Sequence, residues 1–273
     1  MKRKVLQELI KWKNSPERKP LILEGARQVG KTYLLRDIFG QEQYEDVLYL
    51  NLQNPSPEVL GLFEGSIEPQ RLVDQLELLF HKDIIPGKTL IFLDEIQGVP
   101  RALTSLKYFC EELPEQHVVA AGSLLGVFIH PEASFPVGKV NTLRLEPMDF
   151  EEFLWAKGEE DLTEHIKLQP SNTIFKAKLI DLLREYLFVG GMPEVVKEWV
   201  QNHDVVRAES VQRQILMDYM RDFSKHADDT LAAKIRLVFD SLPAQFAKAN
   251  DKFLYGVVRE GARARDYELA IEW

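Results

Sequence analysis

Cysteine, long apolar runs and repeated segments are scarce in this chain. Cys110 is the only cysteine in 273 residues, which excludes an internal disulfide and favours a reducing compartment. No apolar run approaches the roughly 20 residues that a membrane-spanning helix needs, and the N-terminus lacks the apolar segment of a signal peptide. We therefore expect a cytoplasmic protein without a membrane partner.

Basic residues are in deficit overall, but not at the N-terminus. The formal net charge of -9 argues against a protein whose whole surface coats nucleic acid. Residues 1–19 nevertheless carry seven basic side chains against two acidic ones. This stretch fits either a local phosphate-binding face or, more simply, the solvated side of an amphipathic helix.

Short apolar runs alternate with helical patterns in the first half, which is typical of parallel strands joined by crossover helices. We expect strands at residues 20–24, 47–52, 90–93, 118–121 and 140–145. After the first strand, the apolar spacing from Thr32 predicts a helix with Gly40 as its stop. From Phe150 onward the pattern is almost wholly helical. The sequence predicts an α/β domain in residues 1–150, followed by helices.

Residues 25–32 read GARQVGKT and fit the phosphate-loop pattern G-x-x-x-x-G-K-[ST]. In such a loop the backbone N–H groups curl around a phosphate, and the following helix directs its positive end at the anion. We expect Lys31 to reach the β- and γ-phosphates and the Thr32 hydroxyl to ligate Mg²⁺. The predicted nucleotide-binding residues are Gly25, Ala26, Arg27, Gln28, Val29, Gly30, Lys31, Thr32 and Tyr33.

Residues 90–97 read LIFLDEIQ, an apolar strand that delivers two carboxylates at its C-terminal end. Ligands of open α/β sheets bind at that end. Asp94 is a candidate Mg²⁺ ligand, directly or through water, and Glu95 is the candidate base that polarises the attacking water. The same pattern also occurs as a plain strand and turn. The carboxylate pair favours hydrolysis, and a kinase of an unidentified acceptor is the alternative.

Four stretches in this order, GARQVGKT, LIFLDEIQ, AAGS and LEPMDFEEFL, resemble the bacterial and archaeal AAA+ type ATPases with an uncharacterised C-terminal domain. These are relatives of the signalling ATPases called STAND proteins. The resemblance implies a P-loop NTPase fold of the ASCE/AAA+ type with sheet order 5-1-4-3-2. It also implies a helical lid in residues 151–205 and an incomplete winged helix in residues 206–273. ATP and Mg²⁺ are the implied cofactors.

The resemblance implies two further site residues. Ser123 follows the fourth strand, where a polar sensor would contact the γ-phosphate or the water; by spacing alone it belongs to an ordinary turn. Pro193, in the stretch Gly-Gly-Met-Pro, would pack near the adenine base. Alternatively, it only begins a helix at the first turn.

Arginine fingers are harder to assign. Where relatives carry Gly-Arg before the fifth strand, this chain has Gly138 and Lys139. Lysine lacks the planar fork of arginine, so neither a finger at this position nor an obligate hexamer is expected. Arg144 and Arg221 are the remaining candidates, and each is also explained as an exposed strand or helix residue.

The C-terminal region leaves the partner open. Arg259, Arg263 and Arg265 fit either a DNA-reading helix or a solvated helix face. The apolar helix pattern still present at residues 267–273 predicts a chain truncated within a further domain. We expect a nucleotide-controlled switch with slow Mg²⁺-dependent ATP hydrolysis and an unknown protein partner. An ATP-gated DNA-binding protein is the alternative.

Overall fold

The computed structural model describes residues 1–122, 135–168, 174–226, 229–248 and 252–272. These residues belong to two compact units, Met1–Ala208 and Glu209–Trp273, which are described separately. Within the described ranges, no helix has both the length and the apolar character needed to cross a membrane.

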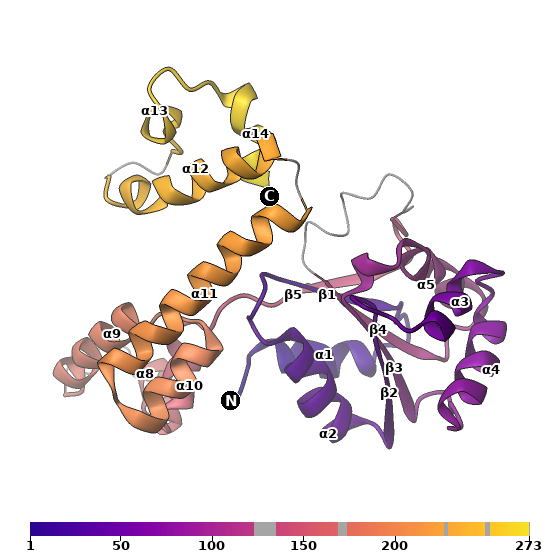
Figure 1. The fold of residues 1–273 in the computed structure, drawn as a ribbon. Helices are drawn as coiled ribbons and strands as arrows, with labels where there is room; N and C mark the ends of the chain where they lie inside the picture. The colour runs from indigo at the N-terminus through magenta and orange to yellow at the C-terminus, as the bar shows by residue number, and fades with distance from the viewer. Residues whose placement is uncertain (123–134, 169–173, 227–228, 249–251, 273) are drawn as a thin grey trace. The chain divides into compact units, whose positions relative to one another are not determined.

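A five-stranded parallel sheet forms the centre of the first unit (Figure 1). The strands are β1 (Leu21–Glu24), β2 (Asp46–Asn51), β3 (Thr89–Asp94), β4 (His117–Gly122) and β5 (Asn141–Arg144). Their order, β2-β3-β4-β1-β5, confirms the predicted order 5-1-4-3-2 and the α/β fold class. Because all neighbouring strands are parallel, the segments that follow β1, β3 and β4 emerge at one edge of the sheet.

Helices cover both faces of the sheet and continue after β5. They are α1 (Val5–Lys13), η1 (Tyr33–Gly40), α2 (Gln41–Gln43), α3 (Pro57–Glu64), α4 (Pro69–Phe80), η2 (Ile96–Gly98), α5 (Pro100–Glu112), α7 (Phe150–Ala156), α8 (Glu160–Leu168), α9 (Lys176–Val189), α10 (Pro193–Asn202) and α11 (Val205–His226). Figure 1 shows α3, α4 and α5 on one side of the sheet and α1 and α2 on the other.

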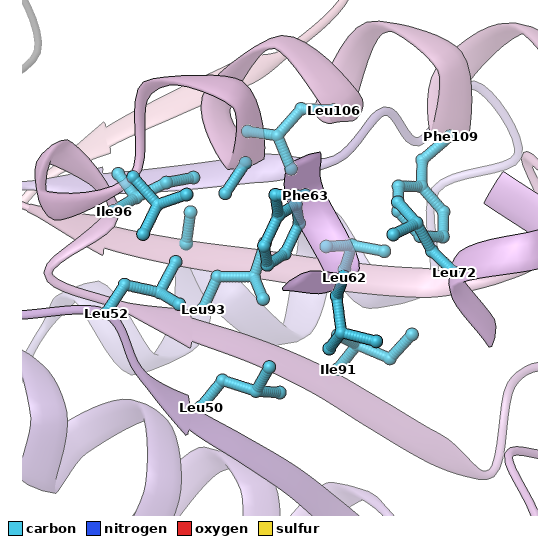
Figure 2. Packing of buried hydrophobic residues seen from close by; sticks show 14 of the residues in the cluster. Leu50, Leu52, Leu62, Phe63, Leu72, Ile91, Leu93, Ile96, Leu106 and Phe109 are labelled. Atoms are coloured by element: carbon cyan, nitrogen blue, oxygen red, sulfur yellow. The ribbon is translucent and has the colours of Figure 1, made fainter. Parts of the chain in front are cut away.

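Alternate residues of the buried strands face opposite sides of the sheet. Ile91 and Leu93 of β3 pack with α3, α4 and α5 (Figure 2), whereas Leu90 and Phe92 pack with α1 and η1. All residues of β3 are buried, which is why this strand reads as a continuous apolar run. The same alternation turns the last residue of the strand, Asp94, toward the η1 side.

The predicted helix stop at Gly40 is wrong, because η1 runs directly into α2 and the helix ends at Gln43. A Cβ atom on Gly40 would lie 2.6 Å from Cγ2 of Val47 and 2.8 Å from the carbonyl oxygen of Leu35. The glycine therefore serves the close approach of β2 to the helix and does not end it.

The helices after β5 begin with a capping box at α7. Asp149 accepts a hydrogen bond from the Glu152 N–H at 2.9 Å, and the Glu152 carboxylate accepts one from the Asp149 N–H at 3.3 Å. Leu154, Leu162 and Leu182, from α7, α8 and α9, form a small apolar cluster of their own.

The second unit contains the rest of α11 together with α12 (Asp229–Phe246), α13 (Tyr255–Val258) and α14 (Ala264–Glu272). Its core comprises Phe223, Ile235, Val238, Tyr267 and Ala270. Where the structure describes this unit, the regular elements are helices. The winged helix stays a prediction.

Candidate functional site

The phosphate loop joins β1 to the helix that begins at Lys31. Residues 25–30 are irregular, and the Leu34 N–H donates to the Gly30 carbonyl at 2.9 Å as the helix starts. The N–H groups of the first helical turn have no acceptor within the helix and point back toward the loop. Together with the helix dipole they form a site suited to an anion.

Both glycines of the loop are required by the backbone. A Cβ atom on Gly25 would lie 2.2 Å from the carbonyl oxygen of Leu145, the residue after β5. Leu145 in turn donates its N–H to the Glu24 carbonyl at 2.8 Å, which closes β5 against the start of the loop. Gly30 has φ of +92°, a conformation that side chains disfavour. Gln28 also adopts positive φ, at 63°.

Other predicted loop residues differ in exposure. Ala26 and Gln28 are exposed, Arg27 is half-buried, and Val29 is fully buried among the residues that pack against α1 and η1. Tyr33 is 54% exposed, which leaves its ring accessible at the start of η1.

Lys31 is buried and turned onto its own loop. Its Nζ donates to the carbonyl oxygens of Gly25 at 2.9 Å and Ala26 at 2.8 Å. Burial lowers the pKa of Lys31 below its ordinary value, while the negative charges of Glu95 and Asp94 act in the opposite direction. The ammonium group thus lies inside the loop, held by two carbonyl groups that a phosphate could replace.

Asp94 meets the phosphate loop at the end of β3. One carboxylate oxygen, Oδ2, accepts from the Thr32 hydroxyl at 2.8 Å and from the Tyr49 hydroxyl at 2.9 Å. The other, Oδ1, accepts from the Glu95 N–H at 3.1 Å. Burial raises the pKa of Asp94, against the effect of these hydrogen bonds. A hydroxyl and a carboxylate are hard oxygen donors, so Thr32 and Asp94 fit a Mg²⁺ ion.

Tyr49 is a site residue that the sequence reasoning missed. It lies in β2 opposite Phe92 of β3, on the same face of the sheet as Asp94. Burial raises the pKa of Tyr49 to about 12, so the hydroxyl remains a donor at neutral pH. The guanidinium of Arg36, from η1, lies 5.1 Å from the centre of its ring. The alternation of β2 and β3 was the signal that could have identified Tyr49.

Glu95 follows Asp94 in a left-handed conformation, with φ of 52° and ψ of 48°. A residue other than glycine pays about 1–3 kcal/mol for a sparsely populated backbone conformation of this kind, which clusters at functional sites. Its carboxylate accepts a short hydrogen bond from the Gln97 side-chain amide. Gln97 is a second residue that was not anticipated, although it stands in the motif LIFLDEIQ.

The helices after β5 contact the phosphate loop through Pro193. A Cβ atom on Gly30 would lie 3.9 Å from the Pro193 ring, and Pro193 also begins α10 at its first position. Just before it, the Gly191 carbonyl accepts from the Met148 N–H at 2.7 Å. The two stretches GGMP and LEPMDF therefore meet beside the loop.

The sequence also predicted candidates outside the phosphate loop and β3. Ser123 falls outside the described residues. Lys139 pairs with Glu111 at 2.9 Å and Arg144 with Glu146 at 2.6 Å, all at exposed or half-exposed positions. In the second unit, Arg221 lies 3.4 Å from Asp218. Three further arginines there are exposed: Arg259, Arg263 and Arg265. The structure tests neither an arginine-finger role nor a DNA-contacting role for these arginines.

Comparisons with known proteins match two family models to parts of the chain. A model described as an AAA domain matches residues 17–154, about half of the chain. A model described as a domain of unknown function (DUF8612) matches residues 180–273. "Uncharacterized protein MJ1544" of Methanocaldococcus jannaschii is 27% identical over 221 residues, which cover 80% of this chain and 44% of that protein. The chain therefore spans less than half the length of this relative.

Two solved structures are distantly similar. The Aeropyrum pernix ORC1 protein in complex with DNA has 15% identity and a TM-score of 0.40, covering 100% of this chain and 78% of that one. Drosophila ORC bound to DNA has 14% identity and a TM-score of 0.38, covering 98% and 79%.

Proposed function

The chain belongs to the AAA domain family, and we propose on that premise that it is an ATP-binding switch with slow Mg²⁺-dependent ATP hydrolysis. One observation carries the proposal: the hydrogen bond of 2.8 Å between the Thr32 hydroxyl and the Asp94 carboxylate. These residues are 62 positions apart in the sequence, and they come together beside the loop at residues 25–32.

The loop residues would bind the phosphates of ATP. The N–H groups of residues 25–32 would donate to the phosphate oxygens. Lys31 would exchange its two carbonyl acceptors for oxygens of the β- and γ-phosphates. Its compact positive charge would stabilise the negative charge on those oxygens. Pro193, beside Gly30, would pack near the base.

Thr32 and Asp94 would hold Mg²⁺ together with the phosphates and water. Such an ion, when bound, neutralises charge on the phosphates as the terminal bond breaks. Tyr49 donates to the same Asp94 oxygen as Thr32, and it would keep that carboxylate in place when the Thr32 hydroxyl turns to the ion.

Glu95 would act as the general base. A water oxygen attacks the γ-phosphorus, the bond from that phosphorus to the bridging oxygen breaks, and the water proton passes to the Glu95 carboxylate. The products are ADP and inorganic phosphate. Gln97 donates to one oxygen of the Glu95 carboxylate, Oε2, which would orient the group and leave Oε1 to accept the water proton. Ser123 stays a proposed contact to the γ-phosphate.

The switch would work through the helices after β5. The Gly191 carbonyl binds the Met148 N–H, and Pro193 lies next to the loop. Loss of the γ-phosphate would change the loop and shift the helices that carry these contacts, as in other nucleotide-driven transitions. An unknown protein partner would respond to this movement.

Phosphate release by the purified chain tests the proposal. We expect Glu95→Gln to bind ATP like the parent but to lose most hydrolysis, by about 100-fold or more, and Lys31→Ala to lose both activities. Lys11→Ala is the matched control, because Lys11 is exposed on α1, where it pairs with the exposed Glu8. If the Glu95 and Lys31 variants both release phosphate at the parent's rate, the hydrolysis belongs to another site or protein.

A further inference from the structure

Arg3 is a buried charged residue that lies outside every motif of the sequence. It precedes α1, and its side chain is only 7% exposed. Burying an arginine is costly unless its donors are paired. The basic N-terminal stretch was interpreted as a solvated helix face or a phosphate-binding surface, and Arg3 belongs to neither.

The Arg3 guanidinium contacts three separate segments of the first unit. One terminal nitrogen donates to the Val29 carbonyl of the phosphate loop at 3.0 Å. The other donates to the Glu146 carbonyl, which follows β5, through a short hydrogen bond. The third nitrogen, Nε, lies 3.2 Å from the carboxylate of Glu152 on α7 and forms an ion pair with it, without the geometry of a hydrogen bond. One side chain thus joins the loop, the end of the sheet and the first helix after it.

The contact with Val29 fixes the direction of one peptide group in the loop. The Val29 carbonyl and the Gly30 N–H belong to the same planar trans peptide, so they point in opposite directions. While Arg3 holds the carbonyl, the Gly30 N–H is turned away from Arg3. A peptide held in this way is ready to donate to an anion without first reorienting.

Hydrogen bonds also hold Glu152, the partner of Arg3 in this ion pair. Its carboxylate accepts from the Lys4 N–H at 2.7 Å and from the Asp149 N–H of the capping box at 3.3 Å. Like Arg3, its side chain is 7% exposed. A desolvated pair of this kind loses much of its stability when one partner is removed, because the other charge is left unpaired. A displacement of α7 would therefore shift the Arg3 side chain and, through its hydrogen bond to the Val29 carbonyl, the phosphate loop.

We propose that Arg3 is a positioning residue that holds the phosphate loop in its nucleotide-binding conformation and couples it to helix α7. The proposal rests on the proposed nucleotide binding at the same loop. It adds a component from the N-terminal segment, which the loop and strand motifs do not include.

Equilibrium binding of fluorescent ADP tests this role, with each protein tagged at the C-terminus so that the N-terminal segment is native. Arg3→Lys keeps a positive charge for Glu152, but one ammonium cannot bind the Val29 and Glu146 carbonyls in the manner of a fork. We expect Arg3→Lys and Arg3→Ala to weaken ADP binding by about tenfold or more, because each variant loses the charge-assisted hydrogen bond that holds the loop. Lys2→Ala, which removes an exposed pair with Glu160, should bind like the parent.

Thermal unfolding without ligand separates positioning from mere stability. If Arg3→Lys melts at a lower temperature but its folded form binds ADP like the parent, the positioning role is refuted. If Arg3→Ala does not fold, the ADP affinity of Arg3→Lys alone tests the positioning role. A parent that fails to bind ADP would instead refute the proposed function, so the two failures are distinguishable.

A double-mutant cycle tests the coupling to α7. Glu152→Gln keeps the size of the side chain and one acceptor oxygen, but it removes the charge and one of the two acceptors that bind the Lys4 and Asp149 N–H groups. We expect Arg3→Lys and Glu152→Gln together to weaken ADP binding less than the product of their separate effects, because both act on one pair. Independent, multiplicative effects on ADP affinity would overturn the link between loop and helix.

Discussion

Replacing Gly191 with alanine should loosen the helices after β5 from the phosphate loop. A Cβ atom at this position would lie 2.1 Å from the carbonyl oxygen of Met148 and 3.0 Å from its nitrogen. Both neighbours are backbone atoms, which cannot rotate away as a side chain can. The two segments must therefore separate, and the hydrogen bond of 2.7 Å from Met148 to Gly191 must break or lengthen.

The cost follows from these contacts. A lost backbone hydrogen bond that leaves a buried group unpaired costs about 1–3 kcal/mol, and forcing an extra carbon into a packed region costs about 1–3 kcal/mol. Because the segments can relax partly, we expect a total of about 2–4 kcal/mol. The hydrogen bond of 2.9 Å from the Tyr186 hydroxyl to the Met148 carbonyl should weaken as well.

Urea unfolding and ADP binding measure the two consequences. We expect Gly191→Ala to unfold at lower urea than the parent and to bind ADP more weakly, because Pro193 is displaced from Gly30. Gly61→Ala is the matched control: Gly61 lies inside α3 with nothing within 4 Å of an added Cβ, and alanine there should stabilise by about 0.5–1 kcal/mol. If Gly191→Ala unfolds at the parent's urea concentration, the close approach of these segments is not as described.

Three further outcomes are expected. The Tyr44 hydroxyl lies 2.7 Å from Nδ1 of buried His117, whose pKa burial lowers from 6.5 to about 4. The unfolded chain takes up that proton near pH 6.5 and the folded chain only near pH 4, so the stability present above pH 6.5 should fall by up to about 3 kcal/mol toward pH 4. Urea titrations should show a flatter pH dependence for His117→Gln, and an equal slope would contradict this. Tyr49→Phe removes a donor to Asp94 and should raise the Mg²⁺ concentration for half-maximal phosphate release by about tenfold, whereas an unchanged Mg²⁺ titration would exclude that role. Gly40→Ala should lower the melting temperature, because the added Cβ clashes with Val47. A melting temperature equal to the parent's would show that β2 can shift away from the helix without cost.

The sequence predicted the elements whose signals are local. The apolar runs marked all five strands to within about a residue or two, because buried parallel strands need continuous apolar side chains. The strand order came from the family resemblance and not from the runs themselves. The loop pattern and the acidic residues at the end of β3 likewise pointed to side chains that do meet, as Thr32 and Asp94 show.

Contacts that depend on the path of the whole chain were not predictable. Arg3 lies 26 positions from Val29 and 143 from Glu146, and no spacing rule relates them. Gly40 was misread because a glycine after a helical pattern usually ends the helix, whereas here it allows a neighbouring strand to approach. A close approach of this kind becomes visible only when both elements are placed.

Equilibrium binding of ATP with Mg²⁺ to the parent and to Lys31→Ala is the most direct test of the central claim. The account predicts one nucleotide per chain for the parent, binding that weakens when Mg²⁺ is omitted, and no measurable binding for the variant, provided that the variant melts like the parent. No ATP binding by the folded parent, or equal binding by Lys31→Ala, would contradict the assignment of the loop at residues 25–32 as the nucleotide site.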